Sequence, residues 1–389
     1  MVHYMPWYEA KPYSPAWGWH WTMNHYNPDQ TNSAGRREIA SNYYPQIGPY
    51  DSADPVVLEY HVLLMKLAGI DGVIADWYGM DDCNDYALIN QRTLALQKFA
   101  ARAGLKFCLC YEDRSIQAAV NAGRLPAAQA VARAQETMIY AQNQYFNQPG
   151  YLRNGGGRPV LLNFGPIYFA QSAQWTSIFS VLNATNQPSF FSLDRRLPAG
   201  EGAFDWPPMH LSQSTGGTLT PAALNRYFSN FEQDGQGWPA FVSSSFPRFH
   251  DIYRQAGTGS SYGYLGDDGG ATFRSTLARA MTNNSSLVQL VTWNDFGEGT
   301  VLEPTTEHGY RDLAVIQEFR RRYLEPGFSA QANELKLAMR LYTLRRRCGT
   351  EPAVSAGLEK VFQEAVTGDR AGADRRLAGL EAAHRAAKN

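Results

Sequence analysis

The clearest structural signal in this 389-residue chain is the stretch Leu287-Val-Gln-Leu-Val-Thr-Trp-Asn-Asp-Phe-Gly-Glu-Gly-Thr300. Its first half, up to Trp293, is apolar and β-branched, which is typical of a buried strand. The pattern ends in polar residues and glycines, among which Asp295 and Glu298 lie three residues apart. Because buried carboxylates cost free energy, the pair predicts an acid/base function at the C-terminal rim of a barrel. The alternative is a capping aspartate and a surface glutamate in an ordinary loop.

Seven further strand-like segments precede this one and alternate with helical patterns. This alternation, over roughly 300 residues, predicts a parallel sheet, most simply a closed (β/α)8 barrel. An open doubly wound sheet is the alternative, but no glycine-rich phosphate loop follows the first strand. The expected strands are residues 2–8, 72–79, 106–113, 158–164, 190–194, 204–208, 241–246 and 287–293. The expected helices are residues 55–68, 85–103, 126–146, 170–182 and 271–282.

The composition changes near residue 326, where Ala, Arg and Leu become frequent. We therefore expect a barrel over residues 1–325 and a helical extension over 326–389, packed on the barrel or on a partner. We expect its arginines to form a solvated face without chemistry. Two apolar stripes at helical spacing support the extension: Leu337, Leu341, Leu344 and Cys348, and then Leu358, Val361, Phe362 and Ala365.

The net charge indicates which kinds of binding partner the sequence supports. The chain has 35 basic and 36 acidic residues and a formal net charge of −1. This gives no support for nucleic acid or an anionic membrane as a partner. No apolar run reaches the roughly 18 residues that a membrane span needs. No signal peptide is visible, so we expect a cytoplasmic protein, or a secreted or periplasmic one if a leader has been removed.

The four cysteines, Cys83, Cys108, Cys110 and Cys348, are too few and too scattered for a disulfide framework. Cys108 and Cys110 alternate on one face of an expected strand, where buried thiols are common. They lack the spacing of a zinc site. We therefore expect no metal and no cofactor, and the sequence leaves the oligomeric state open.

Aromatic residues are the main departure from ordinary composition, with 22 Tyr, 19 Phe and 9 Trp. Many lie in the first 80 residues, in an irregular segment rich in glycine and proline. A long ordered loop of this kind is often a binding wall, and its rings suit stacking on the C–H faces of a sugar. We expect the segment 16–50 to line a cleft. The alternative is that its rings pack in the core.

Other strand ends also carry acids. Asp76 ends the second expected strand, and Glu112 and Asp113 end the third. In a barrel all of them face the mouth where Asp295 and Glu298 lie. Paired carboxylates with nearby aromatics favour glycoside hydrolysis. A metal hydrolase that uses His20 and His25 is a third possibility, whereas Ser-His-Asp catalysis has no nucleophile elbow to support it.

Four segments resemble glycoside hydrolase families 99 and 71. They are Tyr4-Met-Pro-Trp-Tyr8, Tyr43-Tyr-Pro-Gln-Ile-Gly-Pro-Tyr50, Ala68-Gly-Ile-Asp-Gly-Val-Ile-Ala-Asp-Trp-Tyr-Gly79 and Trp293-Asn-Asp-Phe-Gly-Glu-Gly299. The resemblance runs from about residue 2 to residue 305. It implies a (β/α)8 barrel that cuts α-linked glycans inside a polysaccharide chain, with α-mannosides the substrates of family 99 and α-1,3-glucan that of family 71.

One motif departs from the family 99 pattern. That family usually shows Asn-Glu-Trp-x-Glu-Gly, whereas this chain has Asp295 and Phe296, closer to the Asn-Asp-Tyr-Gly-Glu of family 71. Family 99 retains configuration with help from the substrate's own 2-hydroxyl, which one acid deprotonates. The shorter Asp295 could instead leave room for the water that an inverting enzyme needs.

These observations lead to a glycosidase in which Glu298 is the general acid and Asp295 is the base toward the 2-hydroxyl or toward water. A non-catalytic carbohydrate-binding or polysaccharide-assembly protein on the same barrel is the alternative. The sugar, the linkage and endo or exo action are open from sequence alone. The expected substrate-binding residues are Tyr8, Trp19, His20, Trp21, Tyr44, Asp76, Trp77, Tyr78, Glu112, Trp293 and Asn294.

Overall fold

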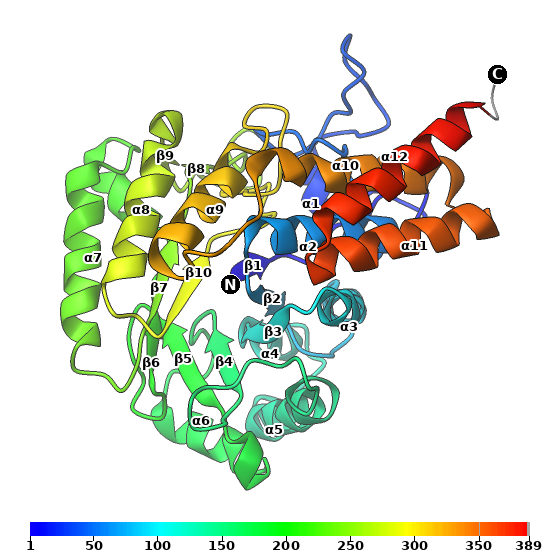
Figure 1. Cartoon of the computed structure of the whole chain (residues 1–389). Coiled ribbons are helices and arrows are strands. Elements are labelled where there is room, and N and C mark those ends of the chain that lie inside the picture. Colours follow the sequence, from blue (N-terminus) through cyan, green and yellow to red (C-terminus); the bar gives the residue numbers. More distant parts are fainter. Residues whose placement is uncertain (350, 387–389) are drawn as a thin grey trace.

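The computed structural model describes residues 1–349 and 351–386 (Figure 1). Eight parallel strands close into a barrel in the order β1-β10-β7-β6-β5-β4-β3-β2. This confirms the predicted (β/α)8 barrel, including its two weakest strand signals, β6 and β7. The strands are β1 (Val2–Tyr4), β2 (Gly72–Trp77), β3 (Lys106–Tyr111), β4 (Val160–Asn163), β5 (Ser189–Leu193), β6 (Gly202–Phe204), β7 (Val242–Ser245) and β10 (Leu287–Leu290).

Helix α2 (Pro55–Ala68) shows how local sequence sets the boundaries. The side chain of Asp54 caps its first turn by accepting a hydrogen bond from the Val56 amide, and Pro55 takes the first helical position. Gly69 ends the helix in the left-handed conformation, with φ of 80°. The other predicted helices are present as α3 (Tyr86–Arg102), α5 (Ala130–Ala141), α6 (Ser172–Phe179) and α8 (Ala271–Thr282).

Several elements were not expected from the sequence. Helix α1 (Trp19–Thr22) lies inside the segment expected to be irregular, and α4 (Arg114–Asn121), α7 (Pro221–Gly235) and α9 (Arg311–Tyr323) complete the outer ring. A short antiparallel pair, β8 (Phe249–His250) with β9 (Tyr264–Leu265), lies outside the barrel. Short turns of 3-10 or π type are η1 (Ala127–Gln129), η2 (Gln142–Phe146), η3 (Ala184–Asn186), η4 (Met209–Thr215), η5 (Asp268–Gly270) and η6 (Ala332–Leu335).

The upper interior of the barrel is polar. His3 on β1 contacts the Gln289 side chain on β10, with 3.4 Å between Nδ1 and Oε1. Gln289 in turn donates to Ser244 Oγ on β7. Because side chains alternate across a strand, these positions point inward while their neighbours pack against the helices. The strand register also sets Asp76 beside Cys110.

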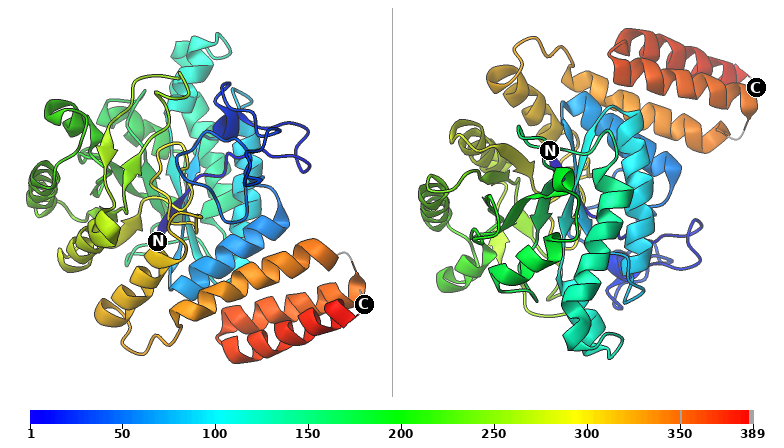
Figure 2. Two further views of the ribbon diagram at one scale, coloured as in Figure 1. Left: turned by 90° about the horizontal axis from the view of Figure 1, so that it is seen from above. Right: turned by 90° about the horizontal axis from the view of Figure 1, so that it is seen from below.

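After α9, the chain forms α10 (Lys336–Cys348), α11 (Pro352–Thr367) and α12 (Arg370–Ala386). These helices lie together outside the ring of barrel elements (Figure 2). Helices α10 and α11 pack on α2, and α12 packs on α11. Both predicted apolar stripes are buried. The boundary near residue 325 stays a proposal.

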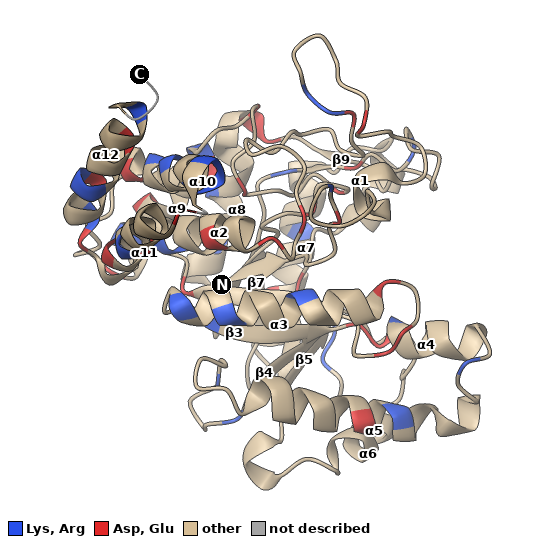
Figure 3. Cartoon of the chain, turned by 90° about the vertical axis from the view of Figure 1, so that its right-hand side faces the viewer, with Lys and Arg blue, Asp and Glu red and all other residues tan. Residues whose placement is uncertain are grey.

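The arginines of these helices do more than form a solvated face, which corrects that expectation. Arg345 makes two hydrogen bonds to the Glu59 carboxylate on α2, of 3.0 and 2.8 Å. Arg346 pairs with Asp54, the cap of the same helix. Acidic and basic residues are mixed on α11 and α12 (Figure 3). Ion pairs therefore tie the helical extension to the barrel.

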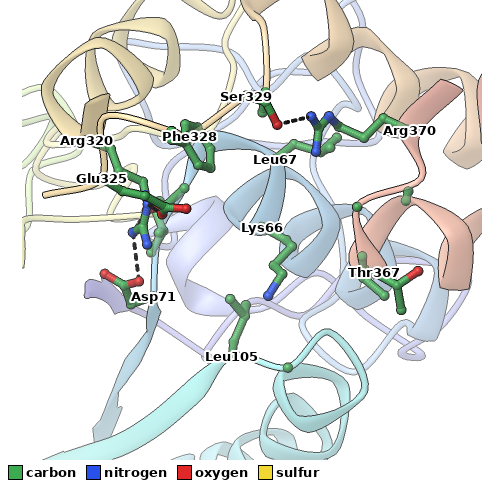
Figure 4. A pocket seen from close by; sticks show the side chains of 18 residues that line it. Lys66, Leu67, Asp71, Leu105, Arg320, Glu325, Phe328, Ser329, Thr367 and Arg370 are labelled. Carbon is green, nitrogen blue, oxygen red and sulfur yellow. Dashed lines mark hydrogen bonds and ion pairs between the residues drawn. The ribbon is translucent and has the colours of Figure 1, made fainter. Parts of the chain in front are cut away.

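A cavity of about 350 Å³ lies where these helices meet the barrel floor, at the residues that precede β2 and β3 (Figure 4). Arg320 bonds to Asp71 at 2.7 Å, and Arg370 bonds to Ser329 at 2.7 Å. The ends of β2 and β3 that carry acids lie on the opposite side of the barrel. No helix in the described ranges is long and apolar enough to cross a membrane.

Candidate active site

A cavity of about 390 Å³, called the acid cavity, opens at the C-terminal ends of the barrel strands. Five carboxylates line its wall: Asp194 after β5, and four at the predicted strand ends, namely Asp76 after β2, Glu112 after β3, and Asp295 and Glu298 after β10. All four residues were predicted from the sequence to face one mouth. Tyr78, also predicted, lines the same cavity.

The loop that carries the acid pair, residues 294–299, is called the acid-pair loop. Inside it Asp295 Oδ1 accepts a hydrogen bond from the Glu298 amide at 3.0 Å, and the Asp295 carbonyl accepts one from the Gly299 amide at 2.9 Å. Gly299 has φ of 71°, and a Cβ atom there would lie 2.6 Å from the His250 carbonyl oxygen. Glycine is therefore required at this position for both conformation and space.

The acid-pair loop is held by the first strand segment. The Tyr8 hydroxyl donates to the Asn294 carbonyl at 2.9 Å and accepts from the Phe296 amide at 3.0 Å. The Asn294 side chain accepts from the Met5 amide and donates to the Met5 carbonyl. Tyr8 and Asn294 are fully buried and were expected to bind substrate. The structure corrects this expectation, because their polar atoms are used to position the loop.

Burial raises the pKa of both members of the acid pair. The pKa of Asp295 rises to about 6 through desolvation, opposed by the hydrogen bond from the Glu298 amide. The pKa of Glu298 rises well above its ordinary value, first through desolvation and then through the charge of Asp295. Glu298 Oε2 is buried and has no hydrogen-bond partner among the described residues. The geometry thus favours a protonated Glu298 beside a more readily ionised Asp295.

The opposite wall holds the second carboxylate pair. Desolvation raises the pKa of Asp76 to about 7, and desolvation followed by the charge of Asp76 raises that of Glu112. The Tyr78 hydroxyl donates to Glu112 Oε1 at 3.0 Å. Arg114 Nε lies 3.4 Å from the other oxygen of Glu112. The cavity therefore contains more carboxyl groups than the half-exposed Arg114 guanidinium can neutralise.

Part of the predicted aromatic wall lines a second cavity of about 440 Å³ that adjoins the first. Trp19 is 42% exposed there. His20 stacks on Trp7, with ring centroids 4.2 Å apart and planes within 5°. Trp7, Tyr78 and Arg114 line both cavities. The structure therefore brings Trp19 and His20 close to the acid cavity.

Three other predicted aromatics lie in the core, which corrects their assignment to the cavity. Trp77 follows the inward-pointing Asp76, so its ring points outward and donates to Asn90 on α3. Trp293 contacts His61 on α2, with ring centroids 5.5 Å apart. Trp21 is fully buried and donates to the Tyr50 carbonyl at 2.8 Å.

Tyr44 also lies away from both cavities. Its hydroxyl accepts from the Arg37 amide at 3.1 Å, and Arg36 lies over its ring. Its own amide donates to Glu307. The residue connects the long N-terminal segment to the loop after β10, and the structure does not bring it to either cavity.

Several cavity residues were missed by sequence reasoning. His3 and Met5 point inward from β1, which the strand alternation could have shown, and Trp206 follows β6. Tyr253 and Tyr262 come from the irregular chain after β7, whose sequence shows neither helical nor strand periodicity. The wall also includes Arg114, Phe164, Leu193, Asp194, Pro207, Pro208, Met209, His210 and Phe249.

A closed (β/α)8 barrel with an acid pair and further carboxylates at its mouth favours the glycoside hydrolase class. Residues 1–186 match the family model of Glycosyl hydrolase family 99. The crystal structure of the GH99 endo-alpha-mannosidase from Bacteroides thetaiotaomicron superposes with a TM-score of 0.61 at 20% identity, over 82% of this chain and 97% of that one. Residues 1–186 are thus similar to family 99, and the resemblance to that family predicted from the motifs is confirmed.

Sequence relatives match shorter segments. A glycoprotein endo-alpha-1,2-mannosidase-like protein of Danio rerio is 34% identical over 86 residues, which is 20% of this chain and 19% of that protein. A glycoprotein endo-alpha-1,2-mannosidase of Mus musculus is 32% identical over 75 residues, 17% of this chain and 16% of that protein. These two matches therefore span less than a fifth of each relative. The acid-pair loop lies beyond residues 1–186, so its role is argued from geometry.

Proposed function

We propose that this protein is a glycosidase that hydrolyses α-mannan-type glycans, with Glu298 as general acid and Asp295 as base. One observation carries the proposal: Glu298, with a raised pKa and a buried Oε2 that has no hydrogen-bond partner among the described residues, lies beside a carboxylate that the backbone helps to ionise. Titratable groups whose environments separate their pKa values are the usual mark of an acid/base pair.

Cleavage of the glycosidic bond needs two proton transfers. Glu298 Oε2 gives its proton to the glycosidic oxygen as the bond to the anomeric carbon breaks. Asp295 takes a proton either from the sugar 2-hydroxyl, which then closes on the anomeric carbon, or from a water that attacks it. In the first course a water then opens the 1,2-anhydro sugar at the anomeric carbon, with Glu298 taking the proton of the water and Asp295 returning its proton to the 2-oxygen, so the anomeric configuration is retained. The second course inverts it, so NMR of the first-formed product separates the two.

Two features support an α-mannan substrate and action within the chain. The structural and sequence relatives are endo-acting α-mannosidases by name. The second cavity with Trp19 and His20 adjoins the acid cavity and adds room for a further sugar ring. The Asp295-Phe296 pair supports α-1,3-glucan as the rival substrate, so both polymers belong in the test.

The experiment measures turnover on yeast-type α-mannan, defined α-mannosides and α-1,3-glucan, with product sizes read by mass spectrometry. The wild type should release oligosaccharides from α-mannan, and Glu298→Gln should lose about a hundredfold or more in rate. The matched control is Glu318→Gln, which changes an exposed glutamate on α9 away from both cavities.

An aryl α-mannoside with an acidic phenol tests the division of roles. Such a leaving group needs little protonation, so Glu298→Gln should recover much of its activity on it, and Asp295→Asn should not. Equal losses on both kinds of substrate would refute the assignment. Binding of glycans with no turnover of any of them would favour a non-catalytic carbohydrate-binding protein.

A further inference from the structure

Three potential metal ligands meet at the floor of the acid cavity. His3, Asp76 and Cys110 come from the adjacent strands β1, β2 and β3, and all three are buried. Their ligand atoms lie within 4.8 Å of one another, and His3 Nε2 is 3.8 Å from Asp76 Oδ1. The register of the barrel produces this cluster, since Asp76 and Cys110 are direct neighbours across two strands.

The Gln289 side chain orients the imidazole of His3 through its Nδ1 atom. Its Nδ1 lies 3.4 Å from Gln289 Oε1, and the Gln289 amide nitrogen donates to Ser244 Oγ at 3.1 Å. With its oxygen toward His3, the amide accepts the Nδ1 proton and leaves the Nε2 lone pair directed at Asp76. Metal-binding histidines are commonly held by such an acceptor on their second nitrogen.

The His3 Nε2 lone pair and the Asp76 carboxylate, two groups that can both bind a cation, lie 3.8 Å apart. At 3.8 Å they are too far apart for a direct hydrogen bond. The surrounding wall adds the acids Glu112, Asp295 and Glu298, and among the described residues that line the cavity Arg114 is the one Lys or Arg side chain. The arrangement therefore favours a bound cation.

We propose that His3, Asp76 and Cys110 form a site for a divalent cation of the zinc class, with its fourth position open to the acid cavity. Nitrogen, oxygen and sulfur ligands together suit zinc, because a thiolate disfavours magnesium and calcium. Three protein ligands and one open position are the pattern of catalytic zinc sites. His3 and Asp76 line the cavity, so the open position would reach a water or a sugar hydroxyl.

This site has no sequence signature, since its ligands lie in three strands far apart in the chain. The proposal departs from the expectation of no metal, which rested on the spacing of possible ligands along the sequence. The inference does not rest on the proposed glycosidase activity, because metal binding is measured without a glycan.

The test uses the untagged full chain, stripped with a chelator and titrated with Zn²⁺ and with Co²⁺. The wild type should bind one ion per chain, and the cobalt form should show the thiolate-to-metal charge-transfer band. Cys110→Ser should abolish that band and weaken binding by about a hundredfold or more. The matched control is Cys108→Ser, a buried cysteine on the same face of β3, which should bind like the wild type.

Asp76→Asn provides a second, nearly isosteric variant, and circular dichroism checks that each variant folds. Failure of the folded wild type to bind an ion stoichiometrically would overturn the site, as would equal behaviour of Cys110→Ser and Cys108→Ser. Glu298→Gln should keep the cobalt spectrum. Metal binding without glycan turnover would overturn only the glycosidase proposal, and turnover without metal binding would overturn only this one.

Discussion

Replacement of Asp295 by asparagine should remove activity and at the same time make the protein more stable at neutral pH. The Asp295 carboxylate is buried beside Asp76 and Glu298, and desolvation raises its pKa from 3.8 to about 6. The native state therefore holds the proton more tightly than the unfolded chain does. A buried group of this kind reduces stability whenever it must ionise.

The sign and size follow from this raised pKa. Between about pH 4 and pH 6 the native state binds more protons than the unfolded state, so stability falls as pH rises through that window. Above the folded pKa the whole penalty is present, and below the unfolded pKa it is absent. A pKa raised by roughly two units corresponds to about 3 kcal/mol. The asparagine of the variant carries no charge, and its side-chain oxygen can still accept the Glu298 amide hydrogen bond.

Urea unfolding of wild type and Asp295→Asn at about pH 4 and at about pH 7 measures this difference. We expect the variant to gain roughly 2–3 kcal/mol relative to wild type between the two conditions. Comparison of the two proteins at each pH cancels the titration of distant groups. A difference that does not change with pH, or a larger loss at neutral pH, would refute the view of Asp295 as a destabilised buried carboxyl.

Three further predictions concern residues around the site. Arg248→Met should cost about 3 kcal/mol because it removes the buried partner of the Asp312 carboxylate and leaves that carboxylate to the partly exposed Arg311, and adding Asp312→Leu should recover most of the loss in chemical unfolding. Trp21→Ala should lower stability by about 3–5 kcal/mol, whereas the exposed Trp19→Ala should change it by less than about 0.5 kcal/mol and weaken glycan binding in calorimetry; equal effects would contradict the assigned positions. Tyr8→Phe should cost about 1–3 kcal/mol and lower kcat with little change in KM, and an unchanged kcat would show that the loop keeps its shape without the hydroxyl.

The barrel was predictable because each strand carries its own local signal. Buried parallel strands are continuous apolar runs, and the runs at β2, β3 and β10 end in acids. The C-terminal ends of parallel strands meet at one rim, so the clustering of Asp76, Glu112, Asp295 and Glu298 followed from strand order alone.

The aromatic residues were less predictable because both a sugar platform and a core favour the same side chains. Trp77 could have been placed by alternation once Asp76 was assigned to the interior. Trp19 and Trp21 are separated by two positions in a four-residue helix, and one is exposed while the other is buried. Nothing in a segment without a period distinguishes them. The tertiary contact of Trp21 with Tyr50 makes the difference.

Hydrogen bonds join the first strand segment of the barrel to the loop after its last strand. They connect the segment that carries the family resemblance to the acid pair. The family 99 match covers residues 1–186 and so includes Tyr8 but not the acid-pair loop. Yet the Tyr8 hydroxyl bonds to the backbone on both sides of Asp295, and the Met5 backbone bonds to the Asn294 side chain. The Tyr-Met-Pro-Trp-Tyr and Asn-Asp-Phe-Gly-Glu-Gly motifs are therefore two halves of one hydrogen-bonded unit. When the first motif adopts this geometry, its hydrogen-bonding groups are already placed to bind the second. The orientation of the Asp295 side chain therefore depends on Tyr8, almost 300 residues earlier in the chain.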